Sequence, residues 1–277
     1  MIKTHRYLDL SKPRLMAIVN ATPDSFSDGG ELFTGDYLDV ELAGRRVEQL
    51  VKDGAEIIDV GGESTRPGAA NVSVQQELDR VISIVEWVVA HCDVAVSVDT
   101  SSPAVMREAA LKGVHLINDI RALTRSDALS AAAQTGLPVC LMHMQGSPVT
   151  MQANPNYQNI VTEVNDYLQQ RVIACLDAGM ASSKIWLDPG FGFGKTLEHN
   201  IELVRKLPEL VSLGQPVLVG FSRKSMVGQM LGRPLDERLV GSLALAMMAL
   251  ERGAKILRVH DVVTTRDIID TFVAINP

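Results

Sequence analysis

Eight short apolar segments recur along the chain, and each ends on or next to a polar or ionisable residue. They span residues 15–20, 57–65, 94–100, 114–119, 139–144, 185–190, 217–224 and 256–261. Near-continuous apolar runs are typical of parallel strands that are buried on both faces. Polar residues that end such strands emerge together at one edge of the sheet. In a (β/α)8 barrel, that edge carries the active site.

The intervening stretches have the length and the mixed composition of helices. Residues 37–53, 73–90, 103–112, 198–212 and 236–252 are the clearest of them. Glycines that suit helix ends follow several of the expected helices, at Gly54, Gly113, Gly136, Gly179 and Gly253. Ser73 with Gln76 predicts a capping box, and Ser102 before Pro103 predicts an N-cap. An open doubly wound sheet is the rival, but eight units in this length favour a closed TIM barrel, with residues 1–277 as one domain.

The bulk properties narrow the class of function. A net charge of −7 and a pI near 5.4 argue against a nucleic-acid surface. The longest apolar stretch, residues 243–250, is too short to cross a membrane, and no charged start precedes an apolar leader. The three cysteines are scattered and form no CxxC motif, which predicts buried thiols in a reducing cytoplasm.

A first group of strand-end residues should lie deep in the barrel. Asp99, Asn118 and Asp188 end strongly apolar runs, and Lys224 follows another. Buried carboxylates need hydrogen-bond donors, which the N–H groups along the edge of a planar heterocycle would supply. The competing interpretation is that they cap strand ends by binding neighbouring loop backbone.

A second group predicts an anion site. Its members are Asn20, Thr65, Arg66, Arg258 and His260. Guanidinium, imidazole, hydroxyl and amide groups around one point suit a phosphate or diphosphate, and the Asn20 carbonyl suits a Mg²⁺ that bridges phosphate oxygens. Each residue taken alone would more often be a solvated loop charge or a structural histidine. The chain lacks HxH, HExxH and CxxC spacings, so a tightly held Zn²⁺ is not expected.

Two connections at the same edge, residues 21–36 and 61–71, are rich in Gly, Pro, Ser and Asp, and they predict long flexible loops that act as lids. Surface loops without a function are the alternative.

The segment GFGFGKT at 190–196 is similar to the end of a Walker A loop. Pro189 replaces the required first glycine, so nucleotide binding through this segment is not expected.

The motifs that carry this chemistry resemble those of the dihydropteroate synthase family. They are IVNATPDSFSDGG (18–30), GGESTRPGA (61–69), SVDTS (97–101), INDI (117–120), MHMQGSPVTMQ (142–152), LDPGFGFGK (187–195), GFSRKS (220–225) and RVHDV (258–262). They cover every strand end in the order of the family. One departure is Ala21, where the family more often has valine.

The resemblance implies that 6-hydroxymethyl-7,8-dihydropterin diphosphate condenses with p-aminobenzoate to give dihydropteroate and diphosphate, in a homodimeric enzyme assisted by Mg²⁺. It implies a pterin site made of Asp99, Asn118, Met142, Asp188, Gly220 and Lys224. It implies a diphosphate site made of Asn20, Thr65, Arg66, Arg258 and His260. It implies a p-aminobenzoate site made of Thr65, Pro67, Phe193, Ser222 and Lys224.

The implied mechanism is loss of diphosphate to leave a pterin cation, followed by attack of the amine. Asp99, Lys224, Arg258 and His260 are the expected catalytic residues. Two alternatives remain open. A pterin-dependent methyltransferase with a corrinoid partner should lack the SRK and RVH anion groups. A non-catalytic pterin-binding paralogue would hold the ring without reacting it, and intact lid motifs argue against this alternative.

Overall fold

The computed structural model describes residues 8–22, 32–34, 37–63, 72–148 and 150–276. Eight parallel strands occupy its centre: β1 (Arg14–Asn20), β4 (Ile57–Gly61), β5 (Ala95–Asp99), β6 (Leu116–Asp119), β7 (Val139–Met142), β8 (Ile185–Asp188), β9 (Leu218–Val219) and β10 (Ile256–Val259). They are hydrogen-bonded in the order β8-β7-β6-β5-β4-β1-β10-β9. A bridge between Leu187 and Val217 joins the two ends, so the sheet closes as a TIM barrel.

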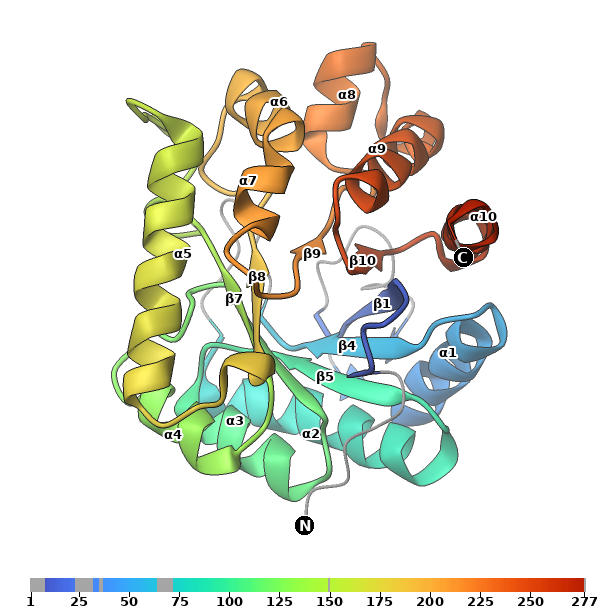
Figure 1. The fold of residues 1–277 in the computed structure, drawn as a ribbon. Helices are drawn as coiled ribbons and strands as arrows, with labels where there is room; N and C mark the ends of the chain where they lie inside the picture. The colour runs from blue at the N-terminus through green and yellow to red at the C-terminus, as the bar shows by residue number, and fades with distance from the viewer. Residues whose placement is uncertain (1–7, 23–31, 35–36, 64–71, 149, 277) are drawn as a thin grey trace.

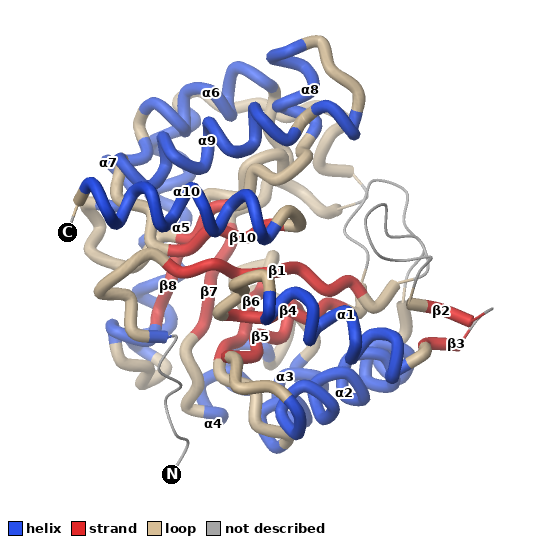
Figure 2. Tube along the Cα trace, turned by 90° about the vertical axis from the view of Figure 1, so that its right-hand side faces the viewer, coloured by secondary structure: helices blue, strands red, loops and turns tan. Residues whose placement is uncertain are grey.

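Helices surround the barrel, as Figure 1 shows. They are α1 (Val40–Lys52), α2 (Val74–His91), α3 (Pro103–Leu111), α4 (Ala128–Thr135), α5 (Ile160–Asp177), α6 (Leu197–Arg205), α7 (Leu207–Val211), α8 (Ser225–Leu231), α9 (Leu239–Glu251) and α10 (Val262–Ile275). Single 3-10 turns lie at Ser182–Lys184 and Leu235–Glu237. A small hairpin, β2 (Phe33–Thr34) with β3 (Tyr37–Leu38), projects from one side (Figure 2).

Side chains alternate along each strand between the helices and the barrel interior. The outward set joins the helices in one large apolar core, for example Leu15, Ala17 and Val19 of β1. The inward set forms a second cluster with one residue from each strand: Met16, Ile57, Ala95, Leu116, Cys140, Trp186, Leu218 and Ile256. Because the side-chain period is two, the next inward residues lie nearer the C-terminal ends of the strands. Those residues include the polar groups of the site.

The helices expected at 73–90 and 103–112 are confirmed, whereas those expected from 37 and 236 begin at Val40 and Leu239, after β3 and a 3-10 turn. Ser73 and Gln76 form the predicted capping box, and Gly54 and Gly113 follow their helices with positive φ. Ser102 is the N-cap of α3 and Pro103 follows in the first turn, as expected, but the Ser102 side chain makes no capping hydrogen bond.

The helix expected at 198–212 is two helices, α6 and α7, that meet at Lys206. Pro208 explains the break, because its ring clashes with the carbonyl four residues earlier and disfavours a helical residue before it.

Three further expectations concern loops, thiols and membranes. Residues 23–31, 35–36 and 64–71 lie outside the described residues, so the lid prediction stays a prediction. Cys140 and Cys175 are buried free thiols and Cys92 is half-buried. Among the described residues, no helix is both long and apolar enough to cross a membrane.

Candidate active site

A cavity of about 660 Å³ opens at the C-terminal ends of the strands. Every described residue of the predicted site lines it: Asn20, Asp99, Asn118, Met142, Asp188, Phe193, Gly220, Ser222, Lys224, Arg258 and His260. The predicted residues Thr65, Arg66 and Pro67 lie outside the described residues. The structure therefore brings together eleven side chains or backbone positions that are scattered over most of the sequence.

Arg258 connects the two groups that the sequence suggested. Its Nε donates to Asp59 Oδ2 at 2.7 Å, and its Nη2 donates to Asp99 Oδ2 at 2.8 Å. Asn118 Nδ2 donates to the same Asp59 oxygen at 3.1 Å. Arg258 was expected beside Asn20 at an anion site, but its guanidinium lies between two carboxylates of the floor. The reason is the register between the strands: Arg258 pairs with Met16, which lies four residues before Asn20 on β1.

Asp59 is a site residue that the sequence reasoning missed. It is fully buried, and its Oδ1 has no hydrogen-bond partner among the described residues. A buried, half-satisfied carboxylate costs stability, which is typical of a functional position. The available signal was an aspartate in the middle of an apolar strand, on the inward face with Ile57 and Gly61.

Two carboxylates of the floor, Asp99 and Asp188, have raised pKa values. Burial raises the pKa of Asp99, although the Arg258 guanidinium opposes the shift. Burial also raises the pKa of Asp188, against the effect of the nearby Lys224 ammonium, while Asp188 Oδ1 accepts the Gly190 N–H at 2.7 Å. Carboxylates that are buried next to an open cavity are ready acceptors for the N–H groups of a ligand.

Lys224 lies where the floor meets the loop after β8. Its ammonium donates to the Phe191 carbonyl at 2.6 Å and lies 4.8 Å from the centre of the Phe193 ring. Burial lowers the pKa of Lys224 to about 8, and Asp188 opposes this shift. A Cβ at Gly220 would come within 3.8 Å of the Lys224 ammonium, so glycine keeps this wall of the cavity open.

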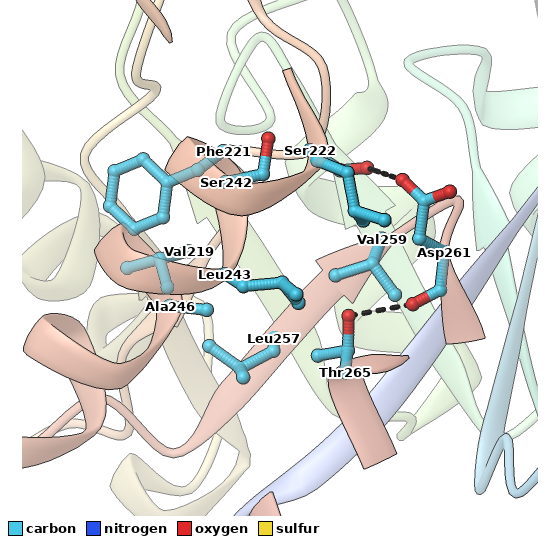
Figure 3. A pocket seen from close by; sticks show the side chains of 11 residues that line it. Val219, Phe221, Ser222, Ser242, Leu243, Ala246, Leu257, Val259, Asp261 and Thr265 are labelled. Carbon is cyan, nitrogen blue, oxygen red and sulfur yellow. Dashed lines mark hydrogen bonds between the residues drawn. The ribbon is translucent and has the colours of Figure 1, made fainter. Parts of the chain in front are cut away.

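The rim next to β10 is built around Ser222. Its hydroxyl is 3.1 Å from His260 Nδ1 and 3.5 Å from Asp261 Oδ2 (Figure 3). Arg223, a non-glycine residue with a φ of 56°, forms an ion pair with Asp261. Burial and the Arg258 charge lower the pKa of His260 to about 4, so its imidazole is neutral near pH 7.

The space behind Ser222, between α9 and the barrel, measures only about 10 Å³. This is too small for a ligand larger than a single water.

Glu63 is another wall residue that the sequence reasoning missed. Arg121 donates to both of its oxygens, at 3.0 and 2.9 Å, which fixes the last described residue before segment 64–71.

A Mg²⁺ fits this rim only if the substrate completes its coordination. Within the described ranges, no group of three His, Cys, Asp or Glu residues could hold a metal ion. Asn20 and Glu63 line the cavity and carry side-chain oxygens, the ligand type that Mg²⁺ prefers, although Arg121 donates to both Glu63 oxygens.

Residues 16–260, which form the barrel and carry its polar end, match the family described as pterin binding enzyme. The dihydropteroate synthase of Haemophilus influenzae is 52% identical over 270 residues, which are 98% of this chain and 96% of that protein. Two solved structures are similar as well. The Yersinia pestis dihydropteroate synthase in a sulfonamide drug complex has a TM-score of 0.93 and 51% identity, and the match covers 100% of this chain and 99% of that one.

The Xanthomonas albilineans dihydropteroate synthase in complex with 7,8-dihydropteroate has a TM-score of 0.85 and 42% identity, over 96% of this chain and 95% of that one. The chain belongs to the pterin binding enzymes and, within them, to the dihydropteroate synthases, which are transferases.

Proposed function

We propose that the cavity joins 6-hydroxymethyl-7,8-dihydropterin diphosphate to p-aminobenzoate and releases diphosphate. One observation carries the proposal: a single cavity places a floor of buried acceptors beside the cations and donors of the rim. The first set suits a ring with N–H groups, and the second suits a diphosphate that leaves from it. The sulfonamide and 7,8-dihydropteroate complexes of the two related enzymes are consistent with both ligands.

The pterin ring would lie on the floor. Asp99, Asn118 and Asp188 provide oxygen acceptors for its N–H groups, and Lys224 provides a donor for its carbonyl or ring nitrogen. Met142 and Gly220 would contact its faces, because both line the cavity without polar side-chain atoms that compete for the ring.

The diphosphate would lie toward the rim on Asn20 and His260, and it would reach the Arg258 guanidinium where that group rises from the floor carboxylates, with Thr65 and Arg66 as further contacts. His260 Nδ1 faces Ser222, which leaves its other ring nitrogen for a phosphate oxygen. We also propose Mg²⁺ as a cofactor, held by Asn20 together with diphosphate oxygens. When bound, the ion would offset negative charge on the leaving group.

The chemistry needs no nucleophilic side chain. The C–O bond of the exocyclic methylene breaks, and its electron pair leaves with the diphosphate. The electron-rich ring holds the cation that remains, and the anionic form of Asp99 stabilises it. The lone pair of the p-aminobenzoate amine then forms the C–N bond, and the amine loses a proton. Arg258 and His260 stabilise the charge that develops on the leaving diphosphate.

The arylamine would bind above the floor. Phe193, Ser222 and Lys224 line that part of the cavity, and Thr65 and Pro67 are the residues that the resemblance adds. The phenyl ring of Phe193 offers a flat apolar contact, while the Ser222 hydroxyl and the Lys224 ammonium offer donors for a carboxylate.

The deciding experiment measures diphosphate release from the pterin substrate with and without p-aminobenzoate, together with the arylated product. The expected result is stoichiometric product and diphosphate, with much less diphosphate when the amine is omitted. Pterin binding without any diphosphate release would instead support the non-catalytic alternative. A pterin that accepts or donates only a methyl group would support the methyltransferase.

We further propose a homodimer. Apolar side chains are exposed on α8 and α9, where Leu231 and Val240 are 50% and 77% exposed, and Met248 lies on the same face of α9 as Val240. A second copy of the chain would cover this face. Val240→Lys should then shift the mass in solution, measured by light scattering, from dimer to monomer.

We also propose the cytoplasm as the location of the enzyme. The three cysteines are free in the structure, two of them are buried, and burial raises the pKa of Cys140 and Cys175. Thiols of this kind are typical of a reducing compartment.

A further inference from the structure

The glycine-rich loop after β8 binds donors through its carbonyl groups. Five consecutive carbonyls, from Gly190 to Gly194, each accept a hydrogen bond from a side chain. Those donors are Lys195 to Gly190 and Phe193, Lys224 to Phe191, Gln152 to Gly192, and Tyr157 to Gly194. A phosphate-binding loop presents its N–H groups to an anion, whereas this loop presents its oxygens to cations and donors. The polarity of the loop therefore agrees with the expectation that its Walker-like sequence does not bind a nucleotide.

Lys195 is the central donor of this loop. Its side chain is only 3% exposed, and it does not line the cavity. Its Nζ lies 3.0 Å from the Gly190 carbonyl and 2.9 Å from the Phe193 carbonyl. It also lies 3.3 Å from the His143 carbonyl and 3.0 Å from His143 Nδ1. One buried cation thus ties the loop after β8 to the end of β7.

Burial lowers the pKa of Lys195 to about 7 and the Asp188 charge opposes this shift, while the acceptors around its Nζ favour the ammonium form. Burial, followed by the Lys195 charge, lowers the pKa of His143 to about 3, so its imidazole is neutral and Nδ1 is available as an acceptor. Four acceptors surround Nζ, and a lysine ammonium supplies three N–H donors and no acceptor. A neutral side chain of the same length would leave the carbonyls buried without donors, which is costly.

The backbone leaves little room for the loop to move independently. Gly190 has a φ of 67°, and a Cβ there would lie 2.0 Å from the His143 carbonyl oxygen. The loops after β7 and β8 are therefore in direct backbone contact at the point where Lys195 joins them. Any shift of the Phe193 carbonyl moves the Phe193 ring, which lines the cavity.

We propose that Lys195 is a positioning residue for the arylamine substrate. Its ammonium holds the Phe193 carbonyl and so positions the Phe193 ring. It also holds the Gly190 carbonyl, next to Phe191, whose own carbonyl accepts from the Lys224 ammonium. The inference rests on the proposed assignment of Phe193 and Lys224 to the p-aminobenzoate site. It adds a residue outside the cavity that determines the shape of that site.

The test compares Lys195→Met with Lys184→Met. Lys184 also donates to a carbonyl, that of Gly136 at 2.6 Å, but it is exposed and precedes β8 at the opposite end of the barrel. Steady-state kinetics give kcat and the KM for each substrate, and thermal unfolding monitors the fold. In Lys195→Met, the KM for p-aminobenzoate should rise about tenfold, equivalent to about 1.4 kcal/mol, with a much smaller change in the KM for the pterin substrate. Lys184→Met should change neither KM.

A purely structural role predicts a different pattern. It would lower the amount of active enzyme and leave both KM values unchanged, and this result would overturn the inference. If Lys195→Met does not fold, Tyr157→Phe decides, because it removes only the hydroxyl that donates to the Gly194 carbonyl at 2.7 Å. It should raise the same KM by a smaller factor, and an unchanged value would count against the inference.

Phe193→Ala, measured in parallel, separates this inference from the proposed function. An unchanged KM for p-aminobenzoate in Phe193→Ala would overturn the assignment of the arylamine site, and the role of Lys195 with it. A raised KM in Phe193→Ala combined with an unchanged KM in Lys195→Met would overturn only the role of Lys195.

Discussion

The two ends of the barrel interior are formed by the same strands but contain opposite chemistry. At the N-terminal end, one apolar residue from each strand closes the interior, and Leu8 and Leu10 pack against this plug. Two positions further along the same segments, the inward residues are Ile18, Asp59, Ser97, Asn118, Met142, Asp188, Gly220 and Arg258. Three of these residues carry a formal charge, and four have polar or charged side chains that are buried.

This difference separates stability from function along each strand. Burial of the plug removes apolar surface from water, at about 25 cal/mol per Å². The polar end works against folding, because burial raises the pKa of Asp99 and Asp188 and lowers that of Lys224. Each such shift measures the cost of keeping a charge out of water. Changes at one end should therefore affect stability, and changes at the other should affect catalysis.

Trp186→Ala should have the largest effect. Trp186 is a large side chain of the plug and is almost fully buried. Its removal should lower the free energy of unfolding by about 3–5 kcal/mol, from lost burial and the cavity that remains. Urea unfolding measures this change, and kcat/KM per folded molecule should stay near the original value. Trp186→Phe, which keeps a ring in the same place, is the matched control and should lose much less. A large fall in kcat/KM per folded molecule would show that the two ends are coupled.

Asp99→Asn should reverse this pattern. The change keeps the shape of the side chain but removes the charge that would face the pterin cation. We expect kcat/KM to fall by about 10²–10³, as when one electrostatic contact to a transition state is lost. The free energy of unfolding should change much less than in Trp186→Ala, because the Asn side chain keeps an oxygen that can accept from Arg258 Nη2 and Asp59 still pairs with Arg258. Asp267→Asn on the exposed face of α10 is the control for the substitution itself. Near-normal turnover in folded Asp99→Asn would exclude Asp99 as a catalytic residue.

His260→Ala should separate binding of the diphosphate from binding of the pterin ring at the polar end of the barrel. The pterin diphosphate should bind about tenfold more weakly, since hydrogen bonds to charged groups contribute about 1.5–3 kcal/mol, whereas a pterin without phosphate should bind as before. Calorimetry with both ligands measures the difference. Arg258→Ala is less selective, because Arg258 also holds Asp59 and Asp99. Equal losses for both ligands in His260→Ala would remove it from the diphosphate site.

The fold and most of the described site could be predicted from the sequence because both depend on position along a strand. A buried apolar run identifies a strand, and the polar residue at its end is at the C-terminal edge of the barrel whatever its partners are. Asp99, Asn118 and Asp188 were found in this way. Which side chains touch cannot be predicted from one strand, because it depends on the register between strands. The contacts of Arg258 with Asp59 and Asp99 are of this kind, since β4, β5 and β10 are far apart in the sequence.

Two functional residues, Asp59 and Lys195, could not be identified from the sequence because of their local surroundings. Asp59 lies within an apolar run, and only the alternation of side chains along the strand indicates that it faces the barrel interior. Lys195 follows a glycine pattern that suggests phosphate binding, and only the backbone geometry shows that carbonyl groups point to its ammonium. Ser102 illustrates the opposite limit: the residue stands at the N-cap of α3 as predicted, but its side chain makes no capping hydrogen bond.

The smallest expected effect is the pH dependence that the burial of the polar end creates. The value of kcat/KM reports ionisations of the free enzyme. Burial raises the pKa of Asp99 to about 8, so kcat/KM should increase as pH rises toward 8 and the carboxylate that accepts the pterin N–H groups forms. The pKa of Lys224 is lowered to about 8, so kcat/KM should decrease above that pH as the ammonium loses its proton. The result is a bell-shaped profile, with a change of several-fold on the alkaline side. Lys224→Arg keeps a cation whose pKa exceeds about 12, so it should move the alkaline limb to higher pH. Asp99→Asn should change the acidic limb in the activity that remains, and any limb left would come from Asp188, whose pKa burial also raises. If both limbs persist unchanged in these variants, the ionisations belong to other groups, and the polar end is not tuned by the burial of these two residues.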